Sequence, residues 1–225
     1  MTNIDVSVVI PAINEQSSIA ACIKSALSAG AQEVIVSDGG STDDTISVAT
    51  AMGAHKVVKS IPGRGIQLNS GAFVADSDWL LFLHADNRLT PECIRQIGVA
   101  ASKDTHWGAF RQRIESERWS LKAIQWGNEL RVKYRKLPFG DQGIFVRRQL
   151  YKQHGGFAEI ALMEDVEFSK RMRKVSRPAL LKGPILVDAR RWENKGVVRQ
   201  TLLNWSIQLR YRFGESPASL RKRYR

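Results

Sequence analysis

The sequence lacks the features of secreted and membrane-spanning proteins. Its two cysteines, Cys22 and Cys93, fall in predicted helices without metal-ligand spacing, which argues against a disulfide framework. No apolar run approaches the roughly 20 residues that a membrane-spanning helix needs, and residues 1–5 are polar rather than signal-like. These absences predict a reduced, cytoplasmic globular protein.

Two common nucleotide-binding signatures are also missing. The sequence contains no G-x-x-x-x-G-K-[ST] motif. The segment at residues 63–65 is Gly-Arg-Gly, but Leu68 stands where a dinucleotide fingerprint needs its third glycine. A bound nucleotide would therefore not be held as in Walker or Rossmann proteins.

Positive charge is scarce in the first half of the chain and abundant in the second. Residues 1–105 contain 7 Lys and Arg against 11 Asp and Glu, whereas residues 106–225 contain 27 against 11. This asymmetry indicates an anionic partner for the second half, such as nucleic acid, a membrane surface or a phosphorylated ligand. A solvated basic surface is the simpler alternative.

Strand and helix patterns alternate along the chain, which predicts a single α/β domain over residues 1–225. Its central sheet should be mostly parallel, with helices on both faces. A capping box at 41–44 is expected to open the second helix. The strands are expected at 6–10, 34–36, 57–58, 79–83, 107–113 (an edge strand) and 144–146, and residues 180–187 form a further apolar segment. The helices are expected at 15–30, 41–53, 63–75, from 91, 119–135, 164–174 and 196–213, with a frayed tail from 221.

The apolar run at residues 79–83 has the pattern of a strand buried on both faces, and it stops abruptly at His84 and Asp86. Ligands of open α/β sheets bind beyond the carboxyl ends of the strands, and a carboxylate there suits a divalent cation. Alternatively, Asp86 caps the turn ahead of the next helix. The sequence alone leaves both roles open.

Polar clusters follow two earlier strands in the same way. Residues 11–15 follow the first strand, and Asp38 with two glycines follows the second. Glycines before a helix expose backbone N–H groups that suit an anion, and Asp38 has the chemistry to accept a hydrogen bond from a base or ribose. Asn14 and Asp38 are each common turn residues, but their shared position at strand ends favours a site.

Together these motifs resemble family 2 glycosyltransferases of GT-A fold. The resemblance rests on residues 8–15, 37–45, 63–72 and 81–86, and in the second half on Gly-Asp-Gln-Gly at 140–143, Met-Glu-Asp-Val-Glu at 163–167 and Arg-Arg-Trp at 190–192. It covers nearly the whole chain and is closest to a small bacterial branch whose metal motif is His-Ala-Asp.

The resemblance implies a nucleotide-sugar donor bound by residues 1–105 and an acceptor bound by residues 106–195. The implied donor residues are Pro11, Ala12, Asn14, Glu15, Asp38 and Arg64. The implied acceptor-side residues are Gly140, Asp141, Gln142, Glu164, Arg190, Arg191 and Trp192. Asp86 matches the last acid of the family's metal motif and implies Mg²⁺ or Mn²⁺. His84 replaces the first acid of that motif, and it is as well explained by a water-bridged or structural role.

Asp165 matches the aspartate that acts as catalytic base in the family. Displacing a nucleoside diphosphate with an acceptor hydroxyl needs a carboxylate near that hydroxyl, and direct displacement inverts the anomeric centre. An alternative role for Glu164 and Asp165 is to complement the dipole of the helix that they begin. Arg190 to Trp192 lack the glutamine of processive relatives, which argues against polymer synthesis.

Two other function classes fit the sequence less well. A nucleotidyltransferase would show a glycine-rich loop with basic residues after the first strand, and residues 11–15 show none. A nucleic-acid-binding module would explain the basic second half, but RNP, zinc and helix-turn-helix signatures are absent, and acidic strand ends would repel phosphates.

The segment 196–225 is expected to form a basic amphipathic helix and tail. Its apolar stripe consists of Leu202, Trp205, Leu209 and Phe213, and the surrounding charges are mostly arginines. This pattern fits a peripheral contact with an anionic membrane at its inner face and a lipid-linked acceptor. The competing interpretation is that the stripe packs on the protein's own core.

Overall fold

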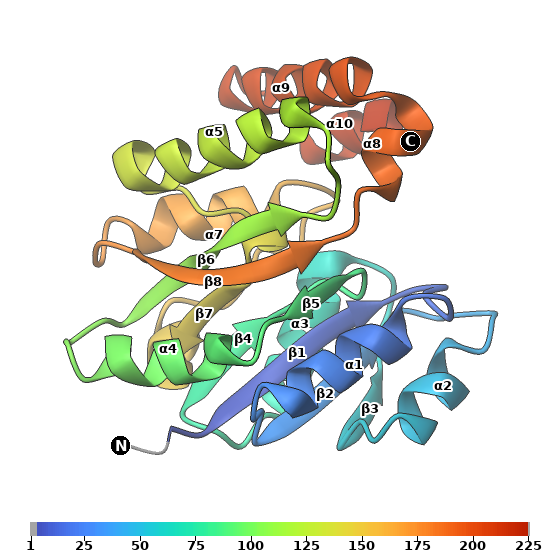
Figure 1. Ribbon diagram of the computed structural model, residues 1–225, viewed down its shortest axis with the longest axis vertical. Helices are drawn as coiled ribbons and strands as arrows, with labels where there is room; N and C mark the ends of the chain where they lie inside the picture. Colours follow the sequence, from blue (N-terminus) through green and yellow to red (C-terminus); the bar gives the residue numbers. More distant parts are fainter. Residues whose placement is uncertain (1–3, 225) are drawn as a thin grey trace.

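A computed structural model describes residues 4–224, and within them one curled sheet of eight strands runs in the order β3-β2-β1-β4-β7-β6-β8-β5 (Figure 1). The strands are β1 (Val6–Ala12), β2 (Glu33–Asp38), β3 (Lys56–Lys59), β4 (Trp79–Phe82), β5 (Asn87–Leu89), β6 (Trp107–Ile114), β7 (Ile144–Arg147) and β8 (Ala179–Val187). The helices are α1 (Ile19–Ser28), α2 (Thr45–Ala51), α3 (Arg64–Phe73), α4 (Glu92–Ala101), α5 (Trp119–Arg135), α6 (Arg148–Gln153), α7 (Glu164–Met172), α8 (Arg190–Lys195), α9 (Val197–Arg212) and α10 (Pro217–Tyr224), with a 3₁₀ turn at Gly140–Gln142.

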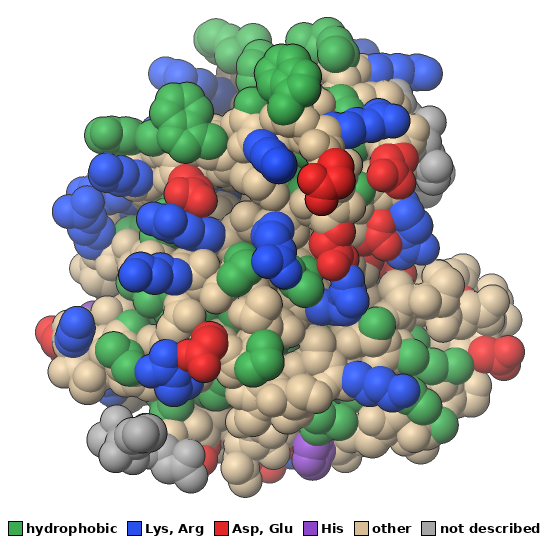
Figure 2. All heavy atoms as spheres, in the orientation of Figure 1, with side chains coloured by type: hydrophobic (Ala, Val, Ile, Leu, Met, Phe, Trp, Pro, Cys, Tyr) green, Lys and Arg blue, Asp and Glu red, His purple; other side chains and the backbone are tan. Residues whose placement is uncertain are grey.

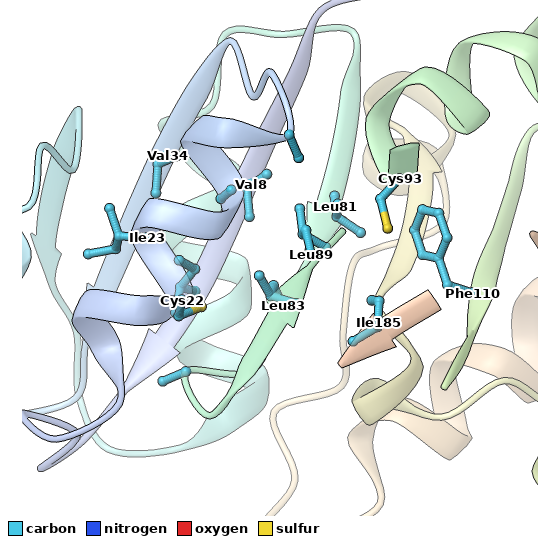
Figure 3. Packing of buried hydrophobic residues seen from close by; sticks show 14 of the residues in the cluster. Val8, Cys22, Ile23, Val34, Leu81, Leu83, Leu89, Cys93, Phe110 and Ile185 are labelled. Atoms are coloured by element: carbon cyan, nitrogen blue, oxygen red, sulfur yellow. The ribbon is translucent and has the colours of Figure 1, made fainter. Parts of the chain in front are cut away.

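Two hydrophobic clusters cover the two faces of the sheet, as predicted. Alternate residues of β1 face opposite ways, so Val8 belongs to the cluster under α1 and α4, whereas Val9 belongs to the cluster under α3, α6 and α7. Figure 3 shows the first cluster, with Cys22 and Ile23 of α1 beside Val8. The sheet is therefore buried on both sides, which explains why its central strands read as continuous apolar runs.

β6 is an interior strand, and the expectation that it is an edge strand is wrong. It pairs with β7 on one side and with β8 on the other. Its first half, with Trp107 and Phe110 both fully buried, lies in the core. Only its second half alternates, with Arg111 and Arg113 exposed, so one side of this half faces solvent.

A short link between β4 and β5 joins the middle of the sheet to its far end. β4 pairs with β1 in the middle of the sheet, whereas β5 pairs with β8 at its far end. Only residues 83–86 separate these two strands in the chain. The predicted metal motif therefore lies where the chain crosses from the parallel half to the mixed half.

Two further expectations about local structure are wrong. The capping box at residues 41–44 does not begin α2, which starts at Thr45, because the preceding residues form a loop held by Asp38 and Asp43. The tail from residue 221 is not frayed as far as it is described. It belongs to α10, which is anchored by the fully buried Leu220; Arg225 lies outside the described residues.

The start of α3 packs so tightly that we expect Gly65→Ala to destabilise the fold. A Cβ at Gly65 would lie 2.3 Å from the carbonyl oxygen of Ala158, and a backbone atom cannot move aside cheaply. Overpacking of this kind typically costs about 1–3 kcal/mol of unfolding free energy, measurable by urea denaturation. Gly127→Ala is the control, because a Cβ in the middle of α5 has nothing within 4 Å. Equal stability of the two variants would contradict the expectation.

Candidate active site

The loops after β1 and β2 lie side by side at the carboxyl edge of the sheet, as the sequence predicted. The backbone N–H of Asn14 donates to Ser41 Oγ at 3.0 Å, and Asn14 Oδ1 accepts from the Thr42 N–H at 2.8 Å. The Glu15 N–H donates to Thr45 Oγ1 at 2.8 Å. Asn14 has a φ of 54°, a conformation that asparagine tolerates better than most residues. These bonds fix the two loops against each other.

Asp38 holds the second of these loops in shape. Its carboxylate accepts hydrogen bonds from the N–H groups of Gly40 at 2.9 Å and Ser41 at 3.0 Å. The side chain is only 2% exposed. This geometry favours a role for Asp38 in holding the turn. Direct contact of Asp38 with a nucleotide base stays a prediction.

Gln67 is a site residue that the sequence did not single out. Its side chain is 3% exposed, and its Nε2 donates to the carbonyl oxygens of Ala12 at 2.9 Å and Ser37 at 3.1 Å. It thereby fastens α3 to the ends of β1 and β2. Its place within the motif at residues 63–72 was the only signal that could have revealed it.

An ion pair joins the two halves of the site. Arg64, at the start of α3, lies 3.1 Å from Glu164 Oε1, at the start of α7. Burial raises the pKa of Glu164, and the neighbouring Asp165 raises it further against the pull of Arg64. Burial also works against the charge of Arg64, yet Glu164, Asp165 and Asp86 raise its pKa. Arg64 therefore pairs directly with Glu164, and the nearby charges of Asp165 and Asp86 favour its charged form.

Asp165 and His84 meet above Gly140. The Gly140 N–H donates to Asp165 Oδ2 at 2.8 Å, and the Val166 N–H donates to Oδ1 at 2.7 Å. A Cβ placed on Gly140 would lie 2.8 Å from His84 Nε2 and 3.3 Å from Asp165 Oδ2. The predicted base Asp165 and the predicted metal motif at His84 thus both lie against Gly140, although they come from opposite halves of the chain.

Asp86 lies on the predicted donor side of the cluster formed by Asp165, His84 and Gly140. Burial raises the pKa of the Cys22 thiol, and the charges of Asp86 and Glu15 raise it further, which places both acids near α1. The Cys22 thiol donates to the His84 carbonyl oxygen at 3.4 Å. The Asp86 side chain accepts no hydrogen bond from the described residues, and α4 begins only at Glu92. A capping role for Asp86 is therefore not what the geometry favours.

A buried polar network supports the turn at residues 140–142, and the sequence did not reveal it. Arg131 of α5 donates to Gln142 Oε1 at 2.7 Å and Asn128 Oδ1 at 2.8 Å. Its guanidinium stacks on Phe139, 3.4 Å from the ring centre. Burial lowers the pKa of Arg131 to about 10, against the opposing charges of Asp141 and Asp165. Gln142, predicted on the acceptor side, is fully buried in this network and acts on the site only through the turn.

The same turn is tied to the metal motif through a backbone carbonyl. The Asp141 carbonyl oxygen accepts from Asn87 Nδ2 and from Gln112 Nε2, both at 3.1 Å. Asn87 follows Asp86 directly, and its side chain is only 1% exposed. The loop at residues 83–86 and the turn at 140–142 therefore form one connected unit.

We expect Gly140→Ala to reduce the predicted transferase activity by up to about 100-fold, because displacing a catalytic group by about 1 Å can cost that much. The added methyl group would push on His84 and Asp165, whereas the backbone φ at residue 140 is not among those that require glycine. Initial rates and the melting temperature should be measured together. A variant with normal rates would mean that neither side chain needs its present position.

The Arg-Arg-Trp motif at residues 190–192 contributes less to the site. Arg190 Nε lies 2.5 Å from Asp188 Oδ2 and is half exposed. Trp192 is 8% exposed and belongs to the main core cluster, so little of its ring is available to stack on a sugar. The side chain of Arg191 lies outside the described residues. The motif serves mainly to hold the chain between β8 and α9.

Sequence comparisons agree with the motifs. A model of Glycosyl transferase family 2 matches residues 7–155. A PGL/p-HBAD biosynthesis glycosyltransferase of Mycobacterium bovis is 28% identical over 189 residues, covering 78% of this chain and 71% of that protein. An uncharacterized glycosyltransferase of Mycobacterium tuberculosis is 37% identical over 84 residues, covering 37% of this chain and 38% of that protein.

Solved structures share the fold. S. aureus TarS 1-349 aligns with a TM-score of 0.67 at 18% identity, covering 82% of this chain and 60% of that one. Glucosyl-3-phosphoglycerate synthase from Mycobacterium tuberculosis, solved with Mn²⁺, uridine diphosphate and phosphoglyceric acid, aligns with a TM-score of 0.59 at 21% identity, covering 83% and 69%. The chain therefore belongs to glycosyl transferase family 2 and is a glycosyltransferase of GT-A fold.

Proposed function

We propose that this protein is a metal-dependent, inverting glycosyltransferase that moves a sugar from a nucleoside-diphosphate donor to an acceptor hydroxyl. The observation that carries the proposal is the placement of the Asp165 carboxylate. Backbone N–H groups of Gly140 and Val166 orient it beside His84, and both Asp165 and Asp86 raise the pKa of the nearby Arg64. A base and a candidate cation ligand are thus in one place.

In this proposal residues 1–105 bind the donor and residues 106–195 bind the acceptor. Pro11, Ala12, Asn14 and Glu15 line the nucleoside pocket beside the loop that Asp38 holds. Arg64, at the beginning of α3, attracts the negatively charged diphosphate, and its ion pair with Glu164 keeps it directed toward the acceptor half.

The residues present fit a divalent cation that is shared with the donor. Within residues 4–224 no three His, Cys, Asp or Glu side chains converge to enclose a metal by themselves. Mg²⁺ is commonly held by one or two carboxylates together with substrate phosphates, which matches a site built on Asp86 with His84 close by. When bound, the ion would neutralise the charge that grows on the leaving diphosphate.

Asp165 takes the proton from the acceptor hydroxyl as that oxygen attacks the anomeric carbon. Asp165 is partly exposed, so an acceptor can reach its carboxylate, and two backbone hydrogen bonds hold that carboxylate in one orientation. Attack from the face opposite the leaving diphosphate inverts the anomeric centre. Glu164 is a poorer base because it is almost fully buried and paired with Arg64.

A donor screen tests the reaction class. UDP-, GDP- and TDP-sugars are incubated with the protein and Mn²⁺, and the products are separated by HPLC. Release of a nucleoside diphosphate supports sugar transfer, whereas release of pyrophosphate would indicate a nucleotidyltransferase. A salt-sensitive shift of DNA at affinities typical of specific binding would instead support the nucleic-acid alternative.

For the acceptor we propose a lipid-linked molecule at the cytoplasmic face of a membrane. The apolar stripe of the C-terminal segment is exposed: Leu202, Trp205, Leu209 and Phe213 are each more than half accessible. The competing interpretation, in which this stripe packs on the protein's own core, does not fit that exposure. No helix within residues 4–224 is long and apolar enough to cross a membrane, so the proposed contact is peripheral.

A further inference from the structure

We propose that α5 and α9 together form a membrane-binding face, and that a basic cleft beside α5 takes the phosphate of an anionic lipid headgroup. This α5–α9 face consists of the exposed side chains Trp119, Trp126 and Tyr134 of α5, Val198, Leu202, Trp205 and Leu209 of α9, and Phe213 at the end of α9. The sequence had indicated only the α9 half. The inference deepens the proposed function by assigning a membrane partner, and it rests on that function only for the acceptor class.

Exposed apolar side chains are concentrated on these two helices. Among the described residues, eight of the thirteen large hydrophobic side chains that are exposed belong to the α5–α9 face. Trp119 and Phe213 are each 80% exposed. Figure 2 shows green side chains gathered at the end of the molecule where Figure 1 places α5 and α9. An apolar concentration of this kind marks an interaction surface rather than ordinary scatter.

The two helices lie next to each other over the second half of the fold. Leu121 and Ile124 of α5 pack on the same core cluster as Val197 of α9. At the other end, burial lowers the pKa of Lys170, and among the nearby cations that lower it further are Arg135 of α5 and Arg212 of α9. The two helices thus lie on the same side of the fold, as Figure 1 shows.

Positive charges outnumber negative ones around the apolar side chains, although Glu117 precedes α5 and Glu215 pairs with Arg210 at 3.2 Å. α9 contains Arg199, Arg210 and Arg212 and no acidic residue, and the acidic residue of α5 is Glu129. Exposed Lys and Arg close to a membrane surface each contribute about 1 kcal/mol of attraction to anionic lipids. Aromatic side chains with polar tips and a ring of basic residues are the features of an interfacial helix.

A cleft of about 440 Å³ lies between α5 and the strands β6 and β8. It is lined by Trp126, Arg111, Glu129, Lys133 and Arg177, among others. Glu129 is engaged by Arg111 at 3.4 Å. Within residues 4–224 no carboxylate pairs with Lys133 or Arg177, so these two cations are available to an external phosphate at the edge of the apolar face.

The charge pattern favours a membrane over a second copy of this chain. A two-fold dimer would bring the same basic helices together, and like charges facing each other oppose association. A lipid surface supplies both the apolar interior and the negative charge that the face lacks. The inner side of α9 packs through Leu203 and Ile207 on Met163 and Val166, which flank Asp165. A lipid-linked acceptor would therefore be held close to the proposed base.

Co-sedimentation of the full chain with vesicles tests this assignment without donor or acceptor. Vesicles of equal parts phosphatidylglycerol and phosphatidylcholine are compared with pure phosphatidylcholine. Point variants are preferable to truncation, because α10 carries the buried Leu220. We expect Trp119→Ser with Trp126→Ser to weaken binding about tenfold or more. Lys133→Gln with Arg177→Gln should weaken binding to the anionic vesicles about 30-fold, at about 1 kcal/mol per charge.

Phe73→Ser is the matched control, because Phe73 is 83% exposed on α3, away from this face, and its loss should leave binding unchanged. Wild-type binding by both double variants, binding to neutral vesicles as tight as to anionic ones, or a stable dimer by light scattering that the Trp variants dissolve would overturn the proposal. Binding that follows the expected pattern, without transfer to a lipid-linked acceptor, would retain the membrane face and reject only the proposed acceptor class.

Discussion

Asp165→Asn is expected to slow sugar transfer by about 10²–10⁴-fold, the usual contribution of a general base, and to leave donor binding unchanged. The amide cannot accept a proton at neutral pH. Asparagine also has only one side-chain oxygen, whereas the backbone N–H groups of Gly140 and Val166 each donate to a separate oxygen of the Asp165 carboxylate. Initial transfer rates and calorimetry of nucleoside diphosphate binding measure the two effects separately.

Glu167→Gln provides the comparison for this variant. Glu167 lies in the same first turn of α7, and its carboxylate pairs with Arg171 at 2.7 Å. Its neutralisation should therefore cost little activity. If Asp165→Asn stays within about threefold of wild type, far below the usual range for a base, the assignment fails, and a large loss in Glu167→Gln would transfer the role to that residue.

Asp86→Ala is expected to abolish the gain in donor affinity that Mn²⁺ or Mg²⁺ provides, with little change in stability. Asp86 lies beyond the end of β4, and its carboxylate accepts no hydrogen bond from the described part of the chain. Removing the Asp86 carboxylate therefore breaks no hydrogen bond within the described part of the chain. Calorimetry of UDP binding with and without Mn²⁺ gives the metal-dependent difference directly.

His84→Ala separates the two members of the motif. If the imidazole is structural, this variant should keep a metal-dependent gain that Asp86→Ala loses. If Asp86→Ala itself keeps the gain, the carboxylate is no metal ligand and the proposed cation site is wrong. Melting temperatures of both variants show whether a lost gain reflects binding or folding.

The first half of the site was predictable because its information is local. Polar residues directly follow apolar strands, and parallel strands bring their carboxyl ends to one edge, so the meeting of Asn14 with the loop after Asp38 follows from the alternation of strands and helices. The same reasoning placed Asp86 at the edge of the sheet. The helix at Trp119–Arg135 was also predicted with its observed bounds.

The second half depends on contacts between distant residues, and a single sequence does not reveal them. Arg131, Asn128 and Gln112 look like ordinary polar residues of a helix and a strand, yet they form the network under the turn at 140–142. β6 was misplaced at the edge because its neighbours β7 and β8 come much later in the chain. The exposure of the stripe on α9 likewise required the packing of the whole second half.

The close approach of His84 to Gly140 makes these two positions interdependent. The space occupied by the imidazole is space that a side chain at residue 140 would fill. A shorter residue at position 84 would vacate it, and a larger residue at position 140 would then be tolerated. Substitutions at the two positions should therefore be non-additive, the hallmark of residues in contact. An engineer who restores an acid at position 84 must choose residue 140 in the same step.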